Sequence, residues 1–182
     1  MQSLIKRLLA DTEGFLNTWS ELGLAMRLRA DGWNVEIDHI FHGQKDVDVR
    51  AEMDGEVRFI DVLSMAPNPL HESSSGFYPM PGSRPLDPKL RAKPQEKFDI
   101  KFQEAKAAGW SGSAWVAMNI ARDDDNLIEA SFRRMLTGQD WQADLAGMLK
   151  REASGLDGVI YFAHSQGQHM VAAAPLRWLS LR

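Results

Sequence analysis

Apolar positions along the chain follow two different periods, which together predict an alternation of helices and strands. Helical spacing comes first, over residues 1–11 and over residues 16–32. The apolar stripe of the second helix consists of Leu16, Trp19, Leu22, Gly23 and Met26. Strand-like patterns predict strands over residues 33–41, 46–53, 56–65, 113–120, 158–164 and 169–175. Further helices are predicted over residues 94–109 and 126–153, the latter broken near Gly138.

The order of these elements predicts a single α/β domain with a mixed sheet. A meander of three strands followed by a crossover helix and another strand is typical of that class. The 182 residues suffice for one domain over residues 1–182, and no internal repeat is visible. The stretch 66–93 reads as a Pro/Ser-rich loop that, together with Pro94, holds seven of the eight prolines. A loop this long is usually functional or disordered.

The segment Asp46–Leu63 predicts a hairpin with acidic residues inside its strands. Asp54-Gly55 between two alternating runs is a strong signal for a two-residue turn. With that turn Met53 pairs with Glu56, and the same register sets Asp48 opposite Asp61, and Asp46 opposite Leu63. The residues predicted to share the core face are Val47, Val49, Ala51, Ile60 and Val62. The residues predicted to share the other face are Asp46, Asp48, Arg50, Glu52, Val57, Phe59, Asp61 and Leu63.

Two opposed carboxylates require a physical explanation. Directly opposed residues on a sheet lie about 4.5–5.5 Å apart at Cβ, and like charges there are destabilising. Either a cation lies between Asp48 and Asp61 or the pKa of one of them is raised. A hard divalent ion such as Mg²⁺ would resolve the conflict. The alternative is a solvated polar face on which Arg50 neutralises one aspartate, as antiparallel sheets often have one wet face.

The order helix–three strands–helix–strand over Leu16–Ile120, with acids in the second and third strands, resembles the PD-(D/E)xK or restriction-endonuclease-like nuclease superfamily. In that family the first helix often carries a glutamate, which Glu21 matches. The second strand carries a metal-binding aspartate, matched by Asp48. The third strand carries (D/E)-x-K, matched by Asp61-Val62-Leu63 except that Leu63 replaces the lysine.

The resemblance implies a restriction-endonuclease-like core and a Mg²⁺- or Mn²⁺-dependent nuclease. Asp48 and Asp61 would hold the metal, and Glu21 would bind it through water or hold a second ion. Lys97 or Lys101, one turn apart on the following helix, would replace the missing strand lysine. The alternative is a nuclease fold that has lost its chemistry with that lysine and serves in nucleic-acid binding or protein assembly.

The distribution of charge adds a second hint. The whole chain carries a net charge of −4. Residues 84–106 carry a net +3, which leaves −7 for the rest of the chain. The basic residues of this segment are Arg84, Lys89, Arg91, Lys93, Lys97, Lys101 and Lys106. We expect the first four to bind nucleic-acid phosphates, and the alternative is a solvated loop and helix face.

Composition adds expectations about location and partners. The chain has no cysteine, which fits a reducing compartment, and its N-terminal apolar run is interrupted by Lys6 and Arg7, unlike a signal peptide. We therefore expect a cytoplasmic protein. No window approaches the length of a membrane span, so no membrane partner is expected. DNA is the expected partner ahead of RNA, and a homodimer is compatible with this class.

Overall fold

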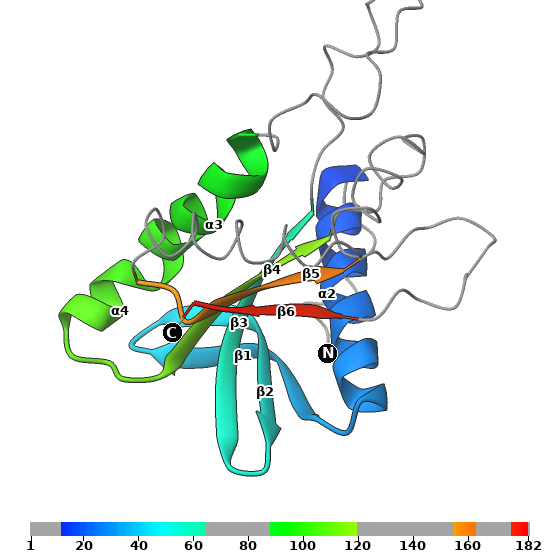
Figure 1. Cartoon of the computed structure of the whole chain (residues 1–182), viewed down its shortest axis with the longest axis horizontal. Coiled ribbons are helices and arrows are strands. Elements are labelled where there is room, and N and C mark those ends of the chain that lie inside the picture. The colour runs from blue at the N-terminus through cyan, green and yellow to red at the C-terminus, as the bar shows by residue number, and fades with distance from the viewer. Residues whose placement is uncertain (1–11, 65–87, 120–154, 163–175, 182) are drawn as a thin grey trace, which may run out of the picture.

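The computed structural model describes residues 12–64, 88–119, 155–162 and 176–181, which form a sheet with helices on both faces (Figure 1). The elements in chain order are α2 (Thr12–Ala30), β1 (Asn34–His42), β2 (Lys45–Met53), β3 (Glu56–Ser64), α3 (Pro88–Lys101), α4 (Gln103–Ala107), β4 (Ser113–Asn119), β5 (Gly158–Phe162) and β6 (Arg177–Ser180). Within these residues no helix is long and apolar enough to cross a membrane. The helices predicted over residues 1–11 and 126–153 lie outside the described residues, as do most of the predicted loop and the strand predicted over 169–175.

The sheet has six strands in the order β1-β2-β3-β4-β5-β6. Strands β1, β2 and β3 are antiparallel neighbours, whereas β3, β4 and β5 run parallel to one another. Strand β6 pairs antiparallel with β5. Because parallel neighbours need a crossover connection, α3 and α4 lie between β3 and β4 in the chain. The predicted α/β class with a mixed sheet is confirmed.

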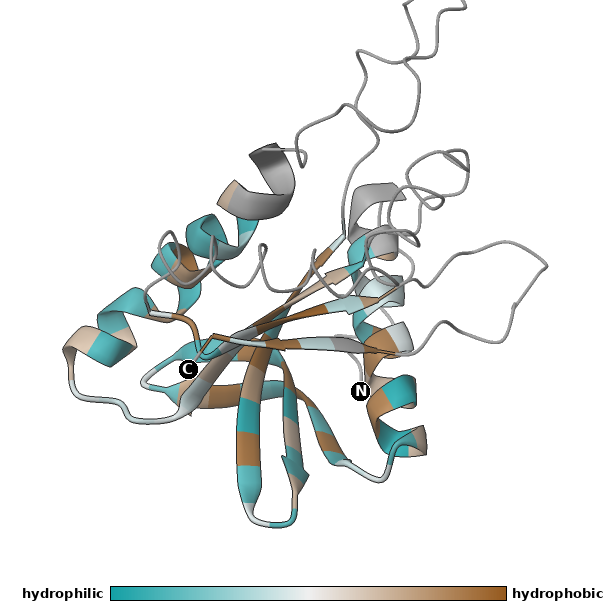
Figure 2. Cartoon of the chain, in the orientation of Figure 1, coloured by the Kyte–Doolittle hydropathy of each residue, from teal (hydrophilic) through white to brown (hydrophobic). Residues whose placement is uncertain are grey.

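Alternate residues of the central strands pack into two separate cores, one on each face of the sheet. On β4, Val116 and Met118 pack with Phe98 and Phe102, and we call this cluster the α3-side core. Trp115 and Ala117 of the same strand pack with residues of α2, and we call that cluster the α2-side core. The helix residues of the α2-side core are Leu24, Ala25 and Leu28. Figure 2 shows hydrophobic residues along the strands and mostly hydrophilic residues along the coloured part of α3.

The predicted hairpin turn is confirmed. Asp54 and Gly55 have φ values of 52° and 81°, so both central residues adopt the left-handed conformation that a type I′ turn requires. Met53 pairs with Glu56, and the predicted register holds for every pair as far as Val49 and Ile60. The predicted pairs Asp48–Asp61 and Asp46–Leu63 are wrong, because the ladder between β2 and β3 ends at Val49 and Ile60. This local turn therefore fixes which residues of β2 and β3 can face one another.

The apolar side chains of β2 on either side of Asp48 point to opposite faces of the sheet, which the alternation of apolar and polar residues did not predict. Val49 packs in the α2-side core as expected, but Val47 packs in the α3-side core. On the neighbouring strand β1, Asp38 adopts a positive φ of 57° between the pairs Ile37–Val49 and His39–Val47. The two strands therefore bend together at this level, and irregularities of this kind re-aim side chains within a sheet.

The bend carries the tip of the β1–β2 hairpin over to α3 and α4. The Phe41 ring lies 5.4 Å from that of Phe102 and 4.8 Å from that of Trp110, measured between ring centroids. Lys45 Nζ lies 2.6 Å from Glu104 Oε2. These contacts hold the start of β2 against the helices while the rest of the strand stays in the sheet.

Three sequence predictions are wrong in detail. The buried residues of α2 centre on Leu24 and Leu28, whereas Met26, placed on the predicted apolar stripe, is 64% exposed. Helix α3 begins at Pro88, so residues 88–93 belong to a helix and Pro94 lies inside it. Pro88, rather than Pro94, is the proline that suits the first turn. Strand β6 was not predicted, since residues 177–180 were left outside any element.

Candidate functional site

Asp48 lies at the point where β2 separates from β3. The backbone N–H of Val62 donates a hydrogen bond to Asp48 Oδ2 at 2.6 Å. Continued past Val49 and Ile60, the register would bring Val62 beside Val47, but Val47 packs in the α3-side core instead. The Asp48 carboxylate therefore replaces a backbone acceptor, and it is held in the gap between the two strands.

Asp61 is fully buried on the face of β3 that α3 covers, with 0% relative exposure. Lys97 Nζ lies 2.9 Å from Asp61 Oδ2, and Lys101 Nζ lies 3.5 Å from Asp61 Oδ1. Lys101 Nζ also lies 3.4 Å from Asp46 Oδ1. Both lysines proposed from the sequence therefore contact Asp61, the aspartate of the third strand. Because Asp61 is buried, the alternative in which it lies on a solvated face of the sheet is excluded.

Glu21 approaches from the other layer of the molecule. It belongs to α2 and is only 5% exposed. Burial raises the pKa of Asp48 to about 8, and the negative charges of Asp61 and Glu21 add to this effect. The Val62 hydrogen bond and Lys101 oppose the rise without cancelling it. Asp61 of β3 and Glu21 of α2 are therefore both close enough to Asp48 to disfavour its charged form.

The lysines do not balance the negative charge of the cluster. Asp46, Asp48, Asp61 and Glu21 would together carry four negative charges, against two positive charges from Lys97 and Lys101. Burial lowers the pKa of Lys101, but attraction to Asp61, Asp48 and Asp46 outweighs it, so the pKa is raised overall. Lys101 therefore stays charged at neutral pH, and the cluster keeps an excess of negative charge unless Asp48 is protonated or a cation enters.

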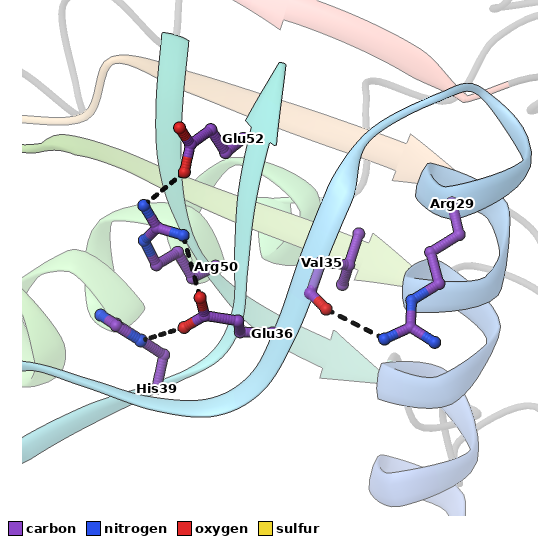
Figure 3. A network of polar contacts seen from close by, with 6 residues as sticks. All are labelled: Arg29, Val35, Glu36, His39, Arg50 and Glu52. Atoms are coloured by element: carbon purple, nitrogen blue, oxygen red, sulfur yellow. Dashed lines mark hydrogen bonds and ion pairs between the residues drawn. The ribbon is translucent and has the colours of Figure 1, made fainter. Parts of the chain in front are cut away.

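Arg50 does not neutralise either aspartate. Figure 3 shows its guanidinium between Glu36 and Glu52, with Nη1 3.2 Å from Glu36 Oε1 and Nη2 2.7 Å from Glu52 Oε2. His39 Nδ1 lies 2.7 Å from the second oxygen of Glu36, on the same side of the hairpin. The solvated-face alternative relied on Arg50 as the partner of an aspartate, and its ion pairs in the structure are with other carboxylates.

The predicted phosphate-binding residues are described only in part. Arg84 lies outside the described residues, while Lys89 and Arg91 fall in the helical backbone of α3 without described side chains. Lys93 is partly exposed and pairs with Glu96, with Nζ 2.5 Å from Oε2. These three helical positions precede Lys97 along α3, so the basic segment leads toward Asp61.

Two features of the cluster were not among the predicted site residues. Asp46 is joined to it through Lys101, although the sequence already placed Asp46 on the same face as Asp48. Ser20, next to Glu21, accepts a buried hydrogen bond from Asn119 Nδ2 at 2.8 Å, which ties α2 to the end of β4. The hydrogen bond between Asn119 and Ser20 joins residues far apart in the chain, so no local sequence pattern predicts it.

The donor set suits a hard cation, but the described side chains do not form a complete cage. All the acidic ligands offer carboxylate oxygens, which Mg²⁺ and Mn²⁺ prefer. Among the described residues no group of three or more His, Cys, Asp or Glu side chains converges closely enough to enclose a metal ion. A cation at Asp48 and Asp61 would therefore take its other ligands from water and substrate, which is usual for Mg²⁺.

Comparison with known proteins adds no relative, because no family model, curated protein or solved structure matches this chain.

Proposed function

We propose that this chain is a metal-dependent nuclease that hydrolyses phosphodiester bonds of nucleic acid on a restriction-endonuclease-like core. One observation carries the proposal. Asp48, which is partly buried, lies close enough to the fully buried Asp61 for their charges to interact, and Lys97, which comes from a helix, lies 2.9 Å from Asp61 although the strand position expected for lysine is Leu63. The described elements α2, β1, β2, β3, α3 and β4 also follow the order on which the family resemblance rests.

Each residue has a role that its position supports. Asp48 and Asp61 would hold a Mg²⁺ or Mn²⁺ ion, and Glu21 would orient water around it. The ion, when bound, would polarise the scissile phosphate and lower the pKa of a bound water. Lys97 would leave its ion pair with Asp61 when the ion binds, and would keep a positive charge beside the attacking water. The basic residues earlier in α3, beginning with Lys93, would bind neighbouring phosphates.

The electrostatics of the cluster support this assignment. Asp48, with a pKa of about 8, is protonated at neutral pH because burial disfavours its charged form and because Asp61 and Glu21 repel that charge. A divalent cation would remove that repulsion and match the two excess negative charges of the cluster. Perturbed ionisation of this kind is common where residues perform chemistry, although structural ion pairs also produce it.

The experiment that tests the function is a cleavage assay with plasmid DNA, single-stranded DNA and RNA. We expect weak cleavage in Mg²⁺ or Mn²⁺, none in chelator, and none with Asp48→Asn or Asp61→Asn. Glu52→Gln is the matched control, because Glu52 is a carboxylate of the same hairpin that pairs with Arg50 instead. Cleavage that survives both aspartate substitutions, or that ignores chelator, would rule out this site.

The alternative function has its own outcome in the same experiment. Salt-sensitive binding without cleavage in either metal would make the protein a nuclease fold kept for nucleic-acid binding. Neither binding nor cleavage of any of the three substrates would refute the nuclease proposal and its binding alternative.

A further inference from the structure

A second candidate site lies on the face of the sheet opposite Asp61. The Arg58 guanidinium carbon lies 4.7 Å from the ring centroid of Trp33, 4.5 Å from that of Trp115 and 4.3 Å from that of Trp178. These rings border an open pocket of about 400 Å³ whose rim includes Asp31 and Ser180. We call this the Arg58 pocket. Trp33 and Trp115 belong to the α2-side core, which separates the pocket from the carboxylate cluster.

Arg58 is not fully satisfied by its neighbours. Its side chain is 15% exposed, and both Nε and Nη2 lie 2.8 Å from the same oxygen of Glu56. Within the described part of the chain, no residue supplies a hydrogen-bond acceptor for Nη1. Nε and Nη2 are used by Glu56, and Nη1 is left to donate to a bound ligand that carries acceptor atoms.

The arrangement of the rings limits the class of ligand. Trp33 and Trp178 are stacked, with centroids 5.5 Å apart and planes 23° apart, and Trp115 meets Trp178 edge to face. Arg58 lies over all three rings, so its positive charge excludes the cationic ligands that aromatic cages often bind. A flat, π-rich ligand with acceptor atoms along one edge is favoured, because guanidinium planes and indole rings both stack such groups.

We propose that the Arg58 pocket binds a nucleobase, with guanine favoured. Arginine binds the O6 and N7 acceptors of guanine, and this is the commonest specific contact between proteins and bases. On its other edge guanine carries N–H donors that suit a carboxylate such as Asp31. The pocket volume is within the range of small-molecule sites. This inference stands on the pocket alone and does not require the carboxylate cluster to bind metal.

The base could belong to a free nucleotide or to a nucleic-acid strand, and both sources share this chemistry. The test is a titration in chelator, followed through the indole N–H signals in NMR spectra of ¹⁵N-labelled protein. The ligands are GMP, AMP, CMP, a thymidine hexanucleotide and the same hexanucleotide with one guanine. We expect GMP and the guanine-containing strand to shift the indole signals of Trp33, Trp115 and Trp178. Whichever of the two binds more tightly identifies the source.

Arg58→Lys keeps the charge beside Glu56 but removes the planar stacking surface. It should weaken binding about 5- to 150-fold, because a bidentate pair of arginine with guanine contributes about 1–3 kcal/mol of discrimination. Arg50→Lys is the matched control, because Arg50 has a similar exposure of 18% and also pairs with glutamate, yet its guanidinium makes no cation–π contact with a described ring. Asp48→Asn should leave the titration unchanged, which separates this site from the proposed nuclease centre.

Three results would overturn the inference. The indole signals could stay unmoved at millimolar concentrations of every ligand. Arg58→Lys and Arg50→Lys could bind GMP equally well. The affinities for GMP and CMP could be equal, which would overturn the assignment of guanine. If cleavage is absent but GMP still shifts these signals, the base pocket stands and the nuclease proposal falls.

Discussion

The carboxyl group of Asp48 is partly buried, and its pKa rises from an ordinary 3.8 to about 8 because this burial and the charges of Asp61 and Glu21 disfavour its ionised form. Between these two values the folded protein keeps a proton that the unfolded chain has released. The unfolded state therefore binds fewer protons in this window, and the free energy of unfolding falls as pH rises from about 4 to 8. Above pH 8 both states are ionised and the penalty stays constant.

Asp48→Asn should remove this pH dependence. We expect the variant to gain stability relative to wild type between pH 5 and pH 8, by up to about 4 kcal/mol, since each pKa unit corresponds to about 1.4 kcal/mol. Urea unfolding of both proteins in chelator at several pH values measures it. If the difference between the two proteins were the same at pH 5 and pH 8, Asp48 would not be the titrating group.

The two lysines beside Asp61 should contribute unequally to cleavage. Lys97 lies 2.9 Å from Asp61, whereas Lys101 lies 3.5 Å away and is shared with Asp46. We expect Lys97→Ala to lower kcat by about 10²–10⁴-fold, the usual contribution of a positioned acid–base or charged group, and Lys101→Ala to lower it less. Single-turnover cleavage rates give the comparison, and melting temperatures check that both variants fold. An equal fall in kcat for the two variants would show that neither lysine has a specific role beside the attacking water.

At the scale of elements, the packing of β4 against β5 depends on a glycine. Gly158 pairs with Trp115, and the Trp115 ring covers the place where a Cβ at residue 158 would lie. An aromatic side chain that covers a glycine on the next strand compensates for the missing side chain there. This pairing also fixes the Trp115 ring that borders the Arg58 pocket.

Gly158→Ala should force the Trp115 ring out of place. We expect a loss of about 1–3 kcal/mol of stability, typical of overpacking in a core. Thermal unfolding measures the loss, and the Trp115 indole signal should shift without any ligand. Ser113→Ala is a milder control, because it removes only the 2.8 Å hydrogen bond that Trp115 Nε1 donates to Ser113. A variant as stable as wild type would mean that the ring has room to move.

At the scale of the whole molecule, charge is unevenly distributed. The net charge is −4, yet residues 84–106 carry +3, and the basic residues of α3 within this segment lead to Lys97 and Asp61. If this segment binds phosphates, log K for nucleic acid should fall linearly with log salt concentration. Lys93→Ala should reduce the magnitude of that slope by about 1. Fluorescence anisotropy with labelled DNA in chelator measures it.

Lys45→Ala is the control for that measurement. Lys45 resembles Lys93 in exposure, 31% against 36%, and each pairs with one glutamate. Lys45 lies at the hairpin tip instead of on α3, so its removal should leave the slope nearly unchanged. Equal slopes for both variants would indicate nonspecific attraction and not a binding surface on α3.

Local signals in the sequence predicted much of the sheet. The Asp54-Gly55 turn fixed the register of β2 and β3, because a two-residue loop determines which residues oppose one another. The face exchange between Val47 and Val49 could not be predicted, since it depends on the packing of Phe41 against Phe102 and Trp110. The Arg58 pocket likewise joins β3 with residues near both ends of the chain.

In the candidate site too, some features follow from local sequence signals and others depend on tertiary packing. Asp48, Asp61 and Lys97 could be proposed from the hairpin register and from the family resemblance, and the structure brings them together. The alternation of apolar and polar residues along the two strands did not predict the burial of Asp61, because the same pattern also fits a solvated polar face. Only the position of α3 over β3 decides that Asp61 is fully buried.

A crystal soaked in Mn²⁺ tests the central claim most directly, because the anomalous signal of manganese locates the ion itself. We expect a peak bonded to carboxylate oxygens of both Asp48 and Asp61, with the Lys97 ammonium displaced from its position 2.9 Å from Asp61. The same soak of Asp61→Asn should show no peak. Wild-type crystals without a peak there, with Lys97 still paired to Asp61, would contradict a metal centre.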